Sequence, residues 1–246
     1  MAKARQGTTD DVARNGANSA RPVLRLASAA TAACFLIAGC GAASGSPDGG
    51  QSNSVTSNAD SDKVLVASGF GQKDRYIWAA ALVRNTGESV GQTVRVHFTV
   101  LDSAGRKLAV GSESGWFAVP QQQLAIGHSF QLRRGTKAAS VEATVSVQDT
   151  GAFGGQPRPA IPVDRVVVKP DGTGNYLAYL KVTNPTSDPL QDPTIGVICY
   201  DTKNRVSGGG IAEPPLLPAS SSIVANASVI ANGADPRCDA YASYRY

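Results

Sequence analysis

The sequence predicts an all-β protein that contains two domains in tandem. Apolar and polar side chains alternate in runs such as Val94-Arg95-Val96-His97-Phe98, and this period of two indicates strands with one buried face. Turn signals such as Asn85-Thr86-Gly87 separate the runs. We find no convincing helical period after residue 61. Several short strands per domain are typical of an immunoglobulin-like β-sandwich, so we expect two such sandwiches in a row.

The second domain is predicted by an internal repeat. Four short blocks recur in the same order, with offsets of 97 to 102 residues. The paired blocks begin at Asp62 and Asp164, at Tyr76 and Tyr176, at Val100 and Cys199, and at Val141 and Cys238. The repeat predicts homologous domains at residues 62–150 and 164–246. Residues 151–163 are rich in Gly and Pro, which predicts an extended, semi-rigid linker.

The first 61 residues have a different composition from the rest. Residues 1–39 carry five basic and two acidic residues and include an uncharged run from Leu26 to Ala38. This run is shorter than the ~20 residues that a membrane-spanning helix needs, so residues 1–39 are predicted to be a signal peptide, with an uncleaved anchor as the alternative. Residues 40–61 are mostly Gly, Ser, Asn and Asp, which predicts a flexible, disordered tether.

The end of the apolar run carries a specific motif. Leu36-Ile37-Ala38-Gly39-Cys40 resembles the lipobox of bacterial lipoproteins. The resemblance implies that Cys40 carries a diacylglyceryl thioether and that the protein bears at least two acyl chains, which stable membrane anchoring requires. We therefore expect a lipid anchor at Cys40 and a body on the extracytoplasmic face of the cell membrane.

The two domains also resemble a family. Phe98-Thr99-Val100-Leu101-Asp102 and Val197-Ile198-Cys199-Tyr200-Asp201 each match part of the Phe-x-Leu-Tyr-Asp signature of the FxLYD β-sandwich domain of bacterial extracytoplasmic proteins. The upstream Val83-Arg84-Asn85 and Val182-Thr183-Asn184 are also similar to that family. Val100 and Cys199 stand where the signature has leucine. The resemblance implies a binding or structural module without a common ligand.

The cysteines divide by context. Cys34 lies in the apolar run and is expected to leave with it, whereas Cys199 and Cys238 form an even pair in an exported protein, which predicts a disulfide. The repeat aligns these two cysteines with Val100 and Val141, so a disulfide is expected where the first domain places core valines. Two buried free thiols are the alternative.

The sequence offers little that indicates catalysis. The two histidines, His97 and His128, have no spacing that suggests a nucleophile or metal partner, and Asp102 and Asp201 are expected to cap turns rather than hold a metal. Residues 207–210 are Ser-Gly-Gly-Gly, which we interpret as a flexible hairpin. We therefore predict no enzyme activity, metal or cofactor. Beyond residue 39 the chain carries 18 basic and 17 acidic residues, which argues against a nucleic-acid partner.

Aromatic residues are the best indication of binding. Trp78 is predicted to lie on the face of its strand opposite the core, and Trp116 and Phe117 are adjacent, so one of them is expected to point outward. Exposed aromatic rings stack on sugars or fill partner pockets. We predict a non-catalytic module that binds an envelope protein or glycan through Trp78, Trp116 or Phe117. The alternatives are packing by these side chains and a purely structural spacer or accessory subunit.

Overall fold

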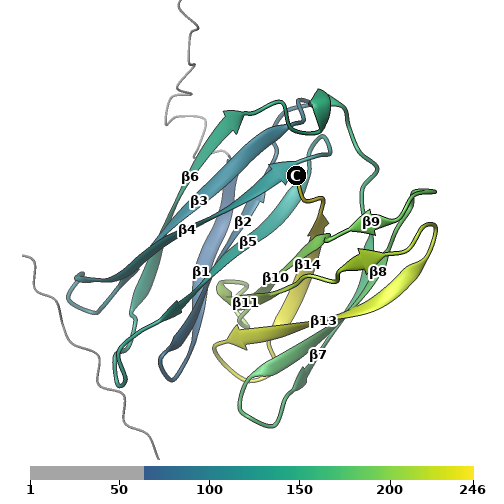
Figure 1. The fold of residues 1–246 in the computed structure, drawn as a ribbon. Helices are drawn as coiled ribbons and strands as arrows, with labels where there is room; N and C mark the ends of the chain where they lie inside the picture. The colour runs from purple at the N-terminus through teal and green to yellow at the C-terminus, as the bar shows by residue number, and fades with distance from the viewer. Residues whose placement is uncertain (1–63) are drawn as a thin grey trace, which may run out of the picture. The chain divides into compact units, whose positions relative to one another are not determined.

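The computed structural model describes residues 64–246, and the described part is built almost entirely of β-strands (Figure 1). This confirms the all-β prediction. The predicted signal peptide, Cys40 and the predicted tether lie outside the described residues. One short 3-10 turn, η1 (Ala152–Gly155), lies between the two sets of strands. No helix in residues 64–246 has the length and apolar character to cross a membrane.

The first sandwich consists of two three-stranded antiparallel sheets. One has the order β1-β2-β5 and the other the order β4-β3-β6. The strands are β1 (Leu65–Lys73), β2 (Tyr76–Arg84), β3 (Gln92–Leu101), β4 (Lys107–Phe117), β5 (Gln123–Gln131) and β6 (Ser140–Asp149). Val94, Val96, Phe98 and Val100 alternate with more exposed residues along β3 and are fully buried, so the period of two places the core as predicted.

The second sandwich repeats this plan with one difference. Its strands are β7 (Val163–Pro170), β8 (Tyr176–Thr183), β9 (Leu190–Gln191), β10 (Thr194–Tyr200), β11 (Val206–Ala212), β12 (Leu216–Leu217), β13 (Ser222–Ala231) and β14 (Arg237–Ser243). The equivalent half-sheets β7-β8-β13 and β11-β10-β14 are joined by pairing of β11 with β13, which gives one six-stranded sheet. Strands β9 and β12 form a separate two-stranded ribbon.

The glycines of β11 allow β11 to pair with β13. The run predicted as a flexible hairpin is a strand, and that interpretation was wrong. Gly208 has φ +150°, and a Cβ there would collide with the carbonyl oxygen of Ile230 on β13. A Cβ at Gly210 would collide with the carbonyl oxygen of Ser228. Without side chains, the β11 backbone comes close enough to β13 to form the ladder.

The repeat aligns a disulfide with a valine pair. Cys199 on β10 and Cys238 on β14 face each other in the ladder and form the expected disulfide. In the first sandwich Val100 on β3 faces Val141 on β6 in the same register position. Strand β14 is an edge strand, held by β10 alone, so the disulfide fastens the last strand of the described chain to its one neighbour.

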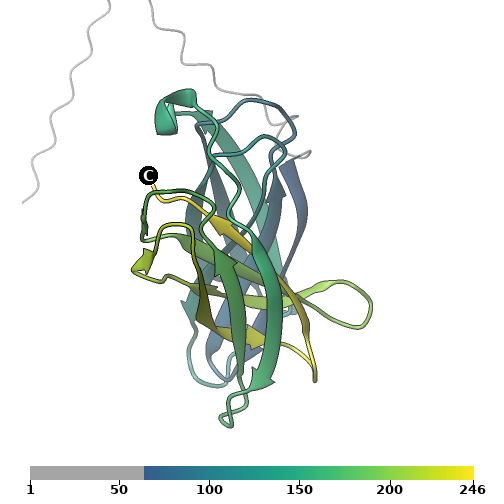
Figure 2. The same ribbon diagram turned by 90° about the vertical axis from the view of Figure 1, so that its right-hand side faces the viewer.

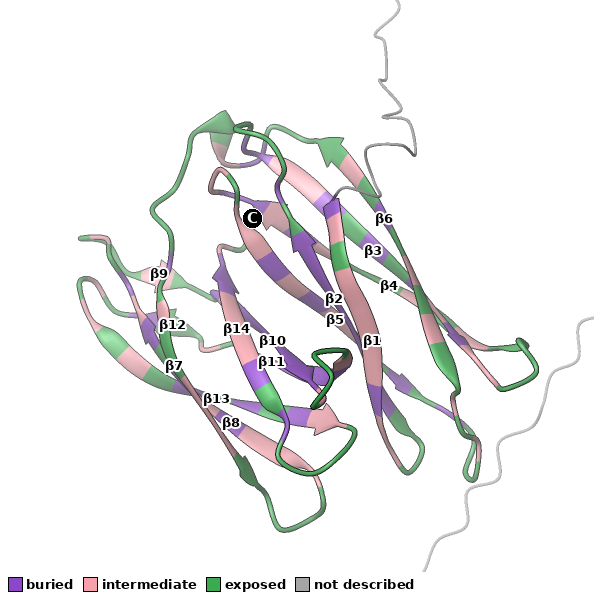
Figure 3. Cartoon of the chain, turned by 180° about the vertical axis from the view of Figure 1, so that it is seen from behind, coloured by how far each residue is buried: buried purple, intermediate pink, exposed green. Residues whose placement is uncertain are grey.

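The two sandwiches pack face to face. The outer face of the β1-β2-β5 sheet lies against β10, β11 and β14, so β2, β10 and β11 are buried along most of their length (Figure 3). Besides the cores of the two sandwiches, a third and smaller apolar cluster fills this contact and is centred on Ala80, Leu82, Ile198 and Tyr200. Glycine again permits close approach, because a Cβ at Gly196 would collide with the carbonyl oxygen of Ala125.

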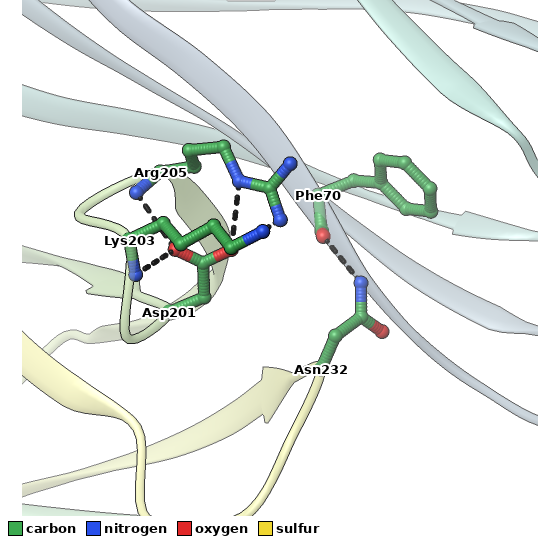
Figure 4. A network of polar contacts seen from close by, with 5 residues as sticks. All are labelled: Phe70, Asp201, Lys203, Arg205 and Asn232. Atoms are coloured by element: carbon green, nitrogen blue, oxygen red, sulfur yellow. Dashed lines mark hydrogen bonds and ion pairs between the residues drawn. The ribbon is translucent and has the colours of Figure 1, made fainter.

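An asparagine also links the sandwiches. Asn232, which follows β13, accepts a hydrogen bond from the Gln72 N–H at 3.0 Å. It also donates one to the Phe70 carbonyl at 2.9 Å (Figure 4). Strand β1 is the edge of its sheet, so its free backbone groups would otherwise lack partners on this side. The side-chain amide of Asn232 thus takes the place of a neighbouring strand.

The first five residues of the linker pack against both sandwiches. Ala152 is buried and its N–H donates to the Gly91 carbonyl at 3.0 Å. The ring of Phe153, a residue with φ +57°, meets Tyr244 and Tyr246 edge to face at 6.1 and 5.4 Å. The turn η1 accordingly lies close to the C-terminus (Figure 2). Residues 151–155 therefore form a compact turn where the sequence predicts an extended segment.

Candidate binding groove between the two sandwiches

A groove of about 370 Å³ lies where the two sandwiches meet. Its walls come from β2, β4 and β5 of the first sandwich and from β10, β11 and the C-terminal residues of the second. The lining residues are Trp78, Glu113, Ser114, Trp116, Gly127, His128, Ser129, Thr194, Ile211, Glu213 and Arg245. The groove therefore contains both tryptophans of the chain.

Trp78 lies at the base of the apolar junction. It is on the face of β2 opposite the core, as alternation predicts, and it packs against the cluster formed by Ala80 and Ile198. Two glycines make room for its indole, because a Cβ at Gly127 would lie 2.5 Å from Nε1 and one at Gly209 would lie 3.1 Å from it. Nε1 is buried and has no hydrogen-bond partner among the described residues. A buried donor without a partner is costly, about 1–3 kcal/mol.

Trp116 and Phe117 point in opposite directions from β4. Phe117 is 1% exposed and belongs to the core of the first sandwich, so it is a packing residue and offers no surface to a partner. Trp116 is half-buried and lines the groove. The structure thus brings together Trp78 and Trp116, two of the three aromatic candidates, and separates the third from them.

Charged groups form the polar part of the groove. His128 Nδ1 lies 3.7 Å from Glu113 Oε2, and the His128 ring packs edge to face on Phe130 at 4.7 Å. On the second sandwich Arg245 pairs with Glu213 at 3.6 Å. All four side chains of these pairs are partly exposed, which leaves their polar atoms able to bind a ligand.

The repeated aspartates cap turns. Asp102 Oδ1 accepts the N–H groups of Ala104 and Arg106 at 2.9 Å each, and Oδ2 pairs with the Arg106 guanidinium at 2.7 Å. The Arg106 N–H is the main reason why the pKa of the Asp102 carboxyl is lowered from its usual value. Asp201 has the same contacts with residues 203 and 205 and the same pKa shift (Figure 4). Both carboxylates thus bind groups of the turns that follow them in the chain.

The repeated asparagines are structural as well. Asn85 is 3% exposed, its Nδ2 donates to the Ser89 carbonyl at 2.8 Å, and its Oδ1 accepts the Gly87 N–H at 3.1 Å. Asn184 is 1% exposed and holds the corresponding loop through Asp188 and Thr186. Within residues 64–246 no group of three or more His, Cys, Asp or Glu side chains is arranged to hold a metal ion.

Sequence reasoning missed most of the groove. It found no functional partner for His128 and did not single out Glu113, Glu213 or Arg245, because the His128–Glu113 and Arg245–Glu213 contacts each join segments that are separated in the sequence. A usable signal is present in the second repeat, where Ala212-Glu213-Pro214-Pro215 replaces the segment around Trp116 and Phe117. No protein-family model and no curated protein matches the chain, so the likeness to the FxLYD and lipoprotein families stays a prediction from the motifs.

Proposed function

We propose that this protein is a lipid-anchored, extracytoplasmic and non-catalytic binding module of the bacterial cell envelope, and that its ligand is a glycan bound in the groove between the sandwiches. The observation that carries the proposal is the meeting of Trp78 and Trp116 in a groove with a charged rim. Aromatic faces stack on the apolar faces of sugar rings, and carboxylate, imidazole and guanidinium groups bind hydroxyls. A volume of about 370 Å³ is at the lower end of the range for small-molecule sites.

The cellular location is supported by two independent features. The Leu36–Cys40 motif resembles a lipobox, and the Cys199–Cys238 disulfide is typical of an oxidising compartment. A non-catalytic role is supported by the use of the repeated polar residues, since Asp102, Asp201 and the two asparagines hold turns.

The test uses the intrinsic fluorescence of the protein. Because both tryptophans lie in the groove, a bound sugar changes their emission, so the full chain is titrated with a panel of purified envelope oligosaccharides. Trp116→Ala is expected to abolish binding by the best oligosaccharide while the protein stays folded. Val110→Ala is the matched control, because Val110 lies on the same strand and is 63% exposed outside the groove.

A structural spacer makes a different prediction. In that case no oligosaccharide binds, and Trp116→Ala changes only the melting temperature. Binding that survives in Trp116→Ala at full strength would also rule out the groove as the site.

A further inference from the structure

A second candidate site lies at one end of the first sandwich, away from the groove. A hollow of about 690 Å³ is formed there by the turn between β1 and β2 and the loop between β5 and β6. Three cationic side chains line it, from Arg75, Arg134 and Lys137, and Asp74 is the one carboxylate among its lining residues. Arg133 is exposed in the same loop.

Among the described residues these cations have no acidic partner. Five ion pairs occur within residues 64–246, and none of them involves Arg75, Arg134 or Lys137. Beyond residue 39 the chain carries almost equal numbers of basic and acidic residues, so three unpaired cations at one hollow are a local excess. Such a concentration creates a positive potential that attracts anions.

The Gln72 side chain holds together the two segments that form the hollow. Gln72 Nε2 donates to the carbonyls of Asp74 and Thr136, at 2.8 Å each, and Gln72 Oε1 accepts the Ala138 N–H at 2.9 Å. This amide ties the β1–β2 turn to the β5–β6 loop. The backbone adds a bond from the Leu132 N–H to the Arg75 carbonyl at 2.8 Å.

Neighbouring side chains also fix the orientation of the Arg75 guanidinium. Its guanidinium lies 5.2 Å from the centre of the Tyr76 ring and donates to the Tyr76 hydroxyl at 3.1 Å. With Gln131 in the amide orientation that satisfies its neighbours, Gln131 Oε1 accepts from the same guanidinium at 3.0 to 3.1 Å. These contacts engage four of the five guanidinium N–H groups, so Arg75 offers a phosphate its positive charge and one remaining N–H group.

From this geometry we propose that the hollow binds the phosphate groups of an anionic, phosphate-bearing polymer. A bilayer surface is a less suitable source of the phosphate. Strand β1 runs ~30 Å from Leu65, where the chain from the predicted anchor enters, to Lys73, next to the hollow. The hollow therefore lies at the end of β1 remote from that entry, and a concave site suits a discrete phosphate group better than a flat sheet of headgroups. This site does not depend on the tryptophan groove.

The experiment uses the full chain with Cys40→Ser, which removes the predicted lipid acceptor. Binding of a short inorganic polyphosphate is measured by calorimetry in three proteins: this parent, Arg134→Gln/Lys137→Gln, and the charge-matched control Lys107→Gln/Arg165→Gln. Neither Arg134 nor Lys137 makes an ion pair or a side-chain hydrogen bond with another described residue, so the double variant is expected to fold. Circular dichroism verifies that all three are folded.

We expect the Arg134→Gln/Lys137→Gln variant to bind polyphosphate about 30-fold more weakly, at roughly fivefold per cation. The control variant should bind as the parent does, and added salt should weaken binding in both. Equal binding by the two variants, or no binding of polyphosphate by the parent, would overturn the proposal.

A third arm uses phosphatidylcholine vesicles with and without phosphatidylglycerol. Binding to the anionic vesicles alone, without polyphosphate binding, would reject the polymer in favour of a lipid surface.

Discussion

Replacing Cys199 and Cys238 together by valine separates the effect of the cross-link from the effect of core packing. The two cysteines face each other across β10 and β14, and the first sandwich places Val100 and Val141 at the equivalent positions. The valine pair therefore has a precedent in the same fold. We expect the double variant to fold with the same strand pairing and to be less stable than the oxidised protein.

The size of the loss follows from the length of the loop. The disulfide joins residues 39 positions apart, and the chain-entropy model gives about 4 kcal/mol for a loop of that length. Exchanging two small buried side chains for valines of similar volume changes packing by less than about 1.5 kcal/mol. For a chain of this size, 4 kcal/mol corresponds to a fall in melting temperature of about 8–16 °C.

The free energy of unfolding and the melting temperature are measured by urea unfolding and calorimetry. The measurements compare the oxidised protein, the reduced protein and the double variant. The double variant should match the reduced protein and lie about 4 kcal/mol below the oxidised one. Equal stability of the variant and the oxidised protein would refute the argument that the cross-link stabilises the second sandwich. A variant much less stable than the reduced protein would refute the equivalence of the cysteine and valine pairs.

Three other perturbations test other parts of the structure. Val100→Cys/Val141→Cys should form a second disulfide, detected as a loss of two hydrogens by mass spectrometry, and should raise stability by up to about 4 kcal/mol. Gly196→Ala should destabilise the junction by about 1–3 kcal/mol in urea unfolding, because its Cβ would collide with the carbonyl oxygen of Ala125, and an unchanged midpoint would contradict the close approach. Burial is the main cause that raises the pKa of Tyr200 to about 12, so its phenol stays protonated in the folded protein after the unfolded chain has ionised near pH 10. The contribution of Tyr200 to stability is therefore intact below pH 10 and is lost between about pH 10 and 12, by about 1.4 kcal/mol per pH unit, which alkaline unfolding and tyrosinate absorbance measure.

The elements that depend on local pattern could be predicted from the sequence. Alternation identified β3 and its buried residues, the even pair of cysteines predicted the Cys199–Cys238 disulfide, and the repeat predicted that it stands where the first sandwich has Val100 and Val141. Both depend on side-chain period and sequence register, which a single chain displays directly. The prediction that Trp78 lies on the face opposite the core has the same basis.

The features that depend on how distant segments pack could not be predicted. Gly208 was interpreted as part of a flexible hairpin because a glycine run weakens a strand, yet here it permits the close approach of β11 to β13. The groove needs two sandwiches to meet. The basic hollow joins Arg75 to Arg134 and Lys137, which are far from it in the sequence, so the short basic cluster at residues 133–137 does not by itself indicate the hollow.

The central claim, that the groove holding Trp78 and Trp116 is the ligand site, is tested most directly by photo-crosslinking in intact cells. A photoreactive amino acid is placed at position 116, and a matched probe is placed at position 110 on the same strand, outside the groove. We expect the probe at position 116 to capture a glycan of the cell envelope, identified by mass spectrometry, and the probe at position 110 to capture none. Capture of the same material at both positions, or no capture at position 116 in folded, exported protein, would contradict it.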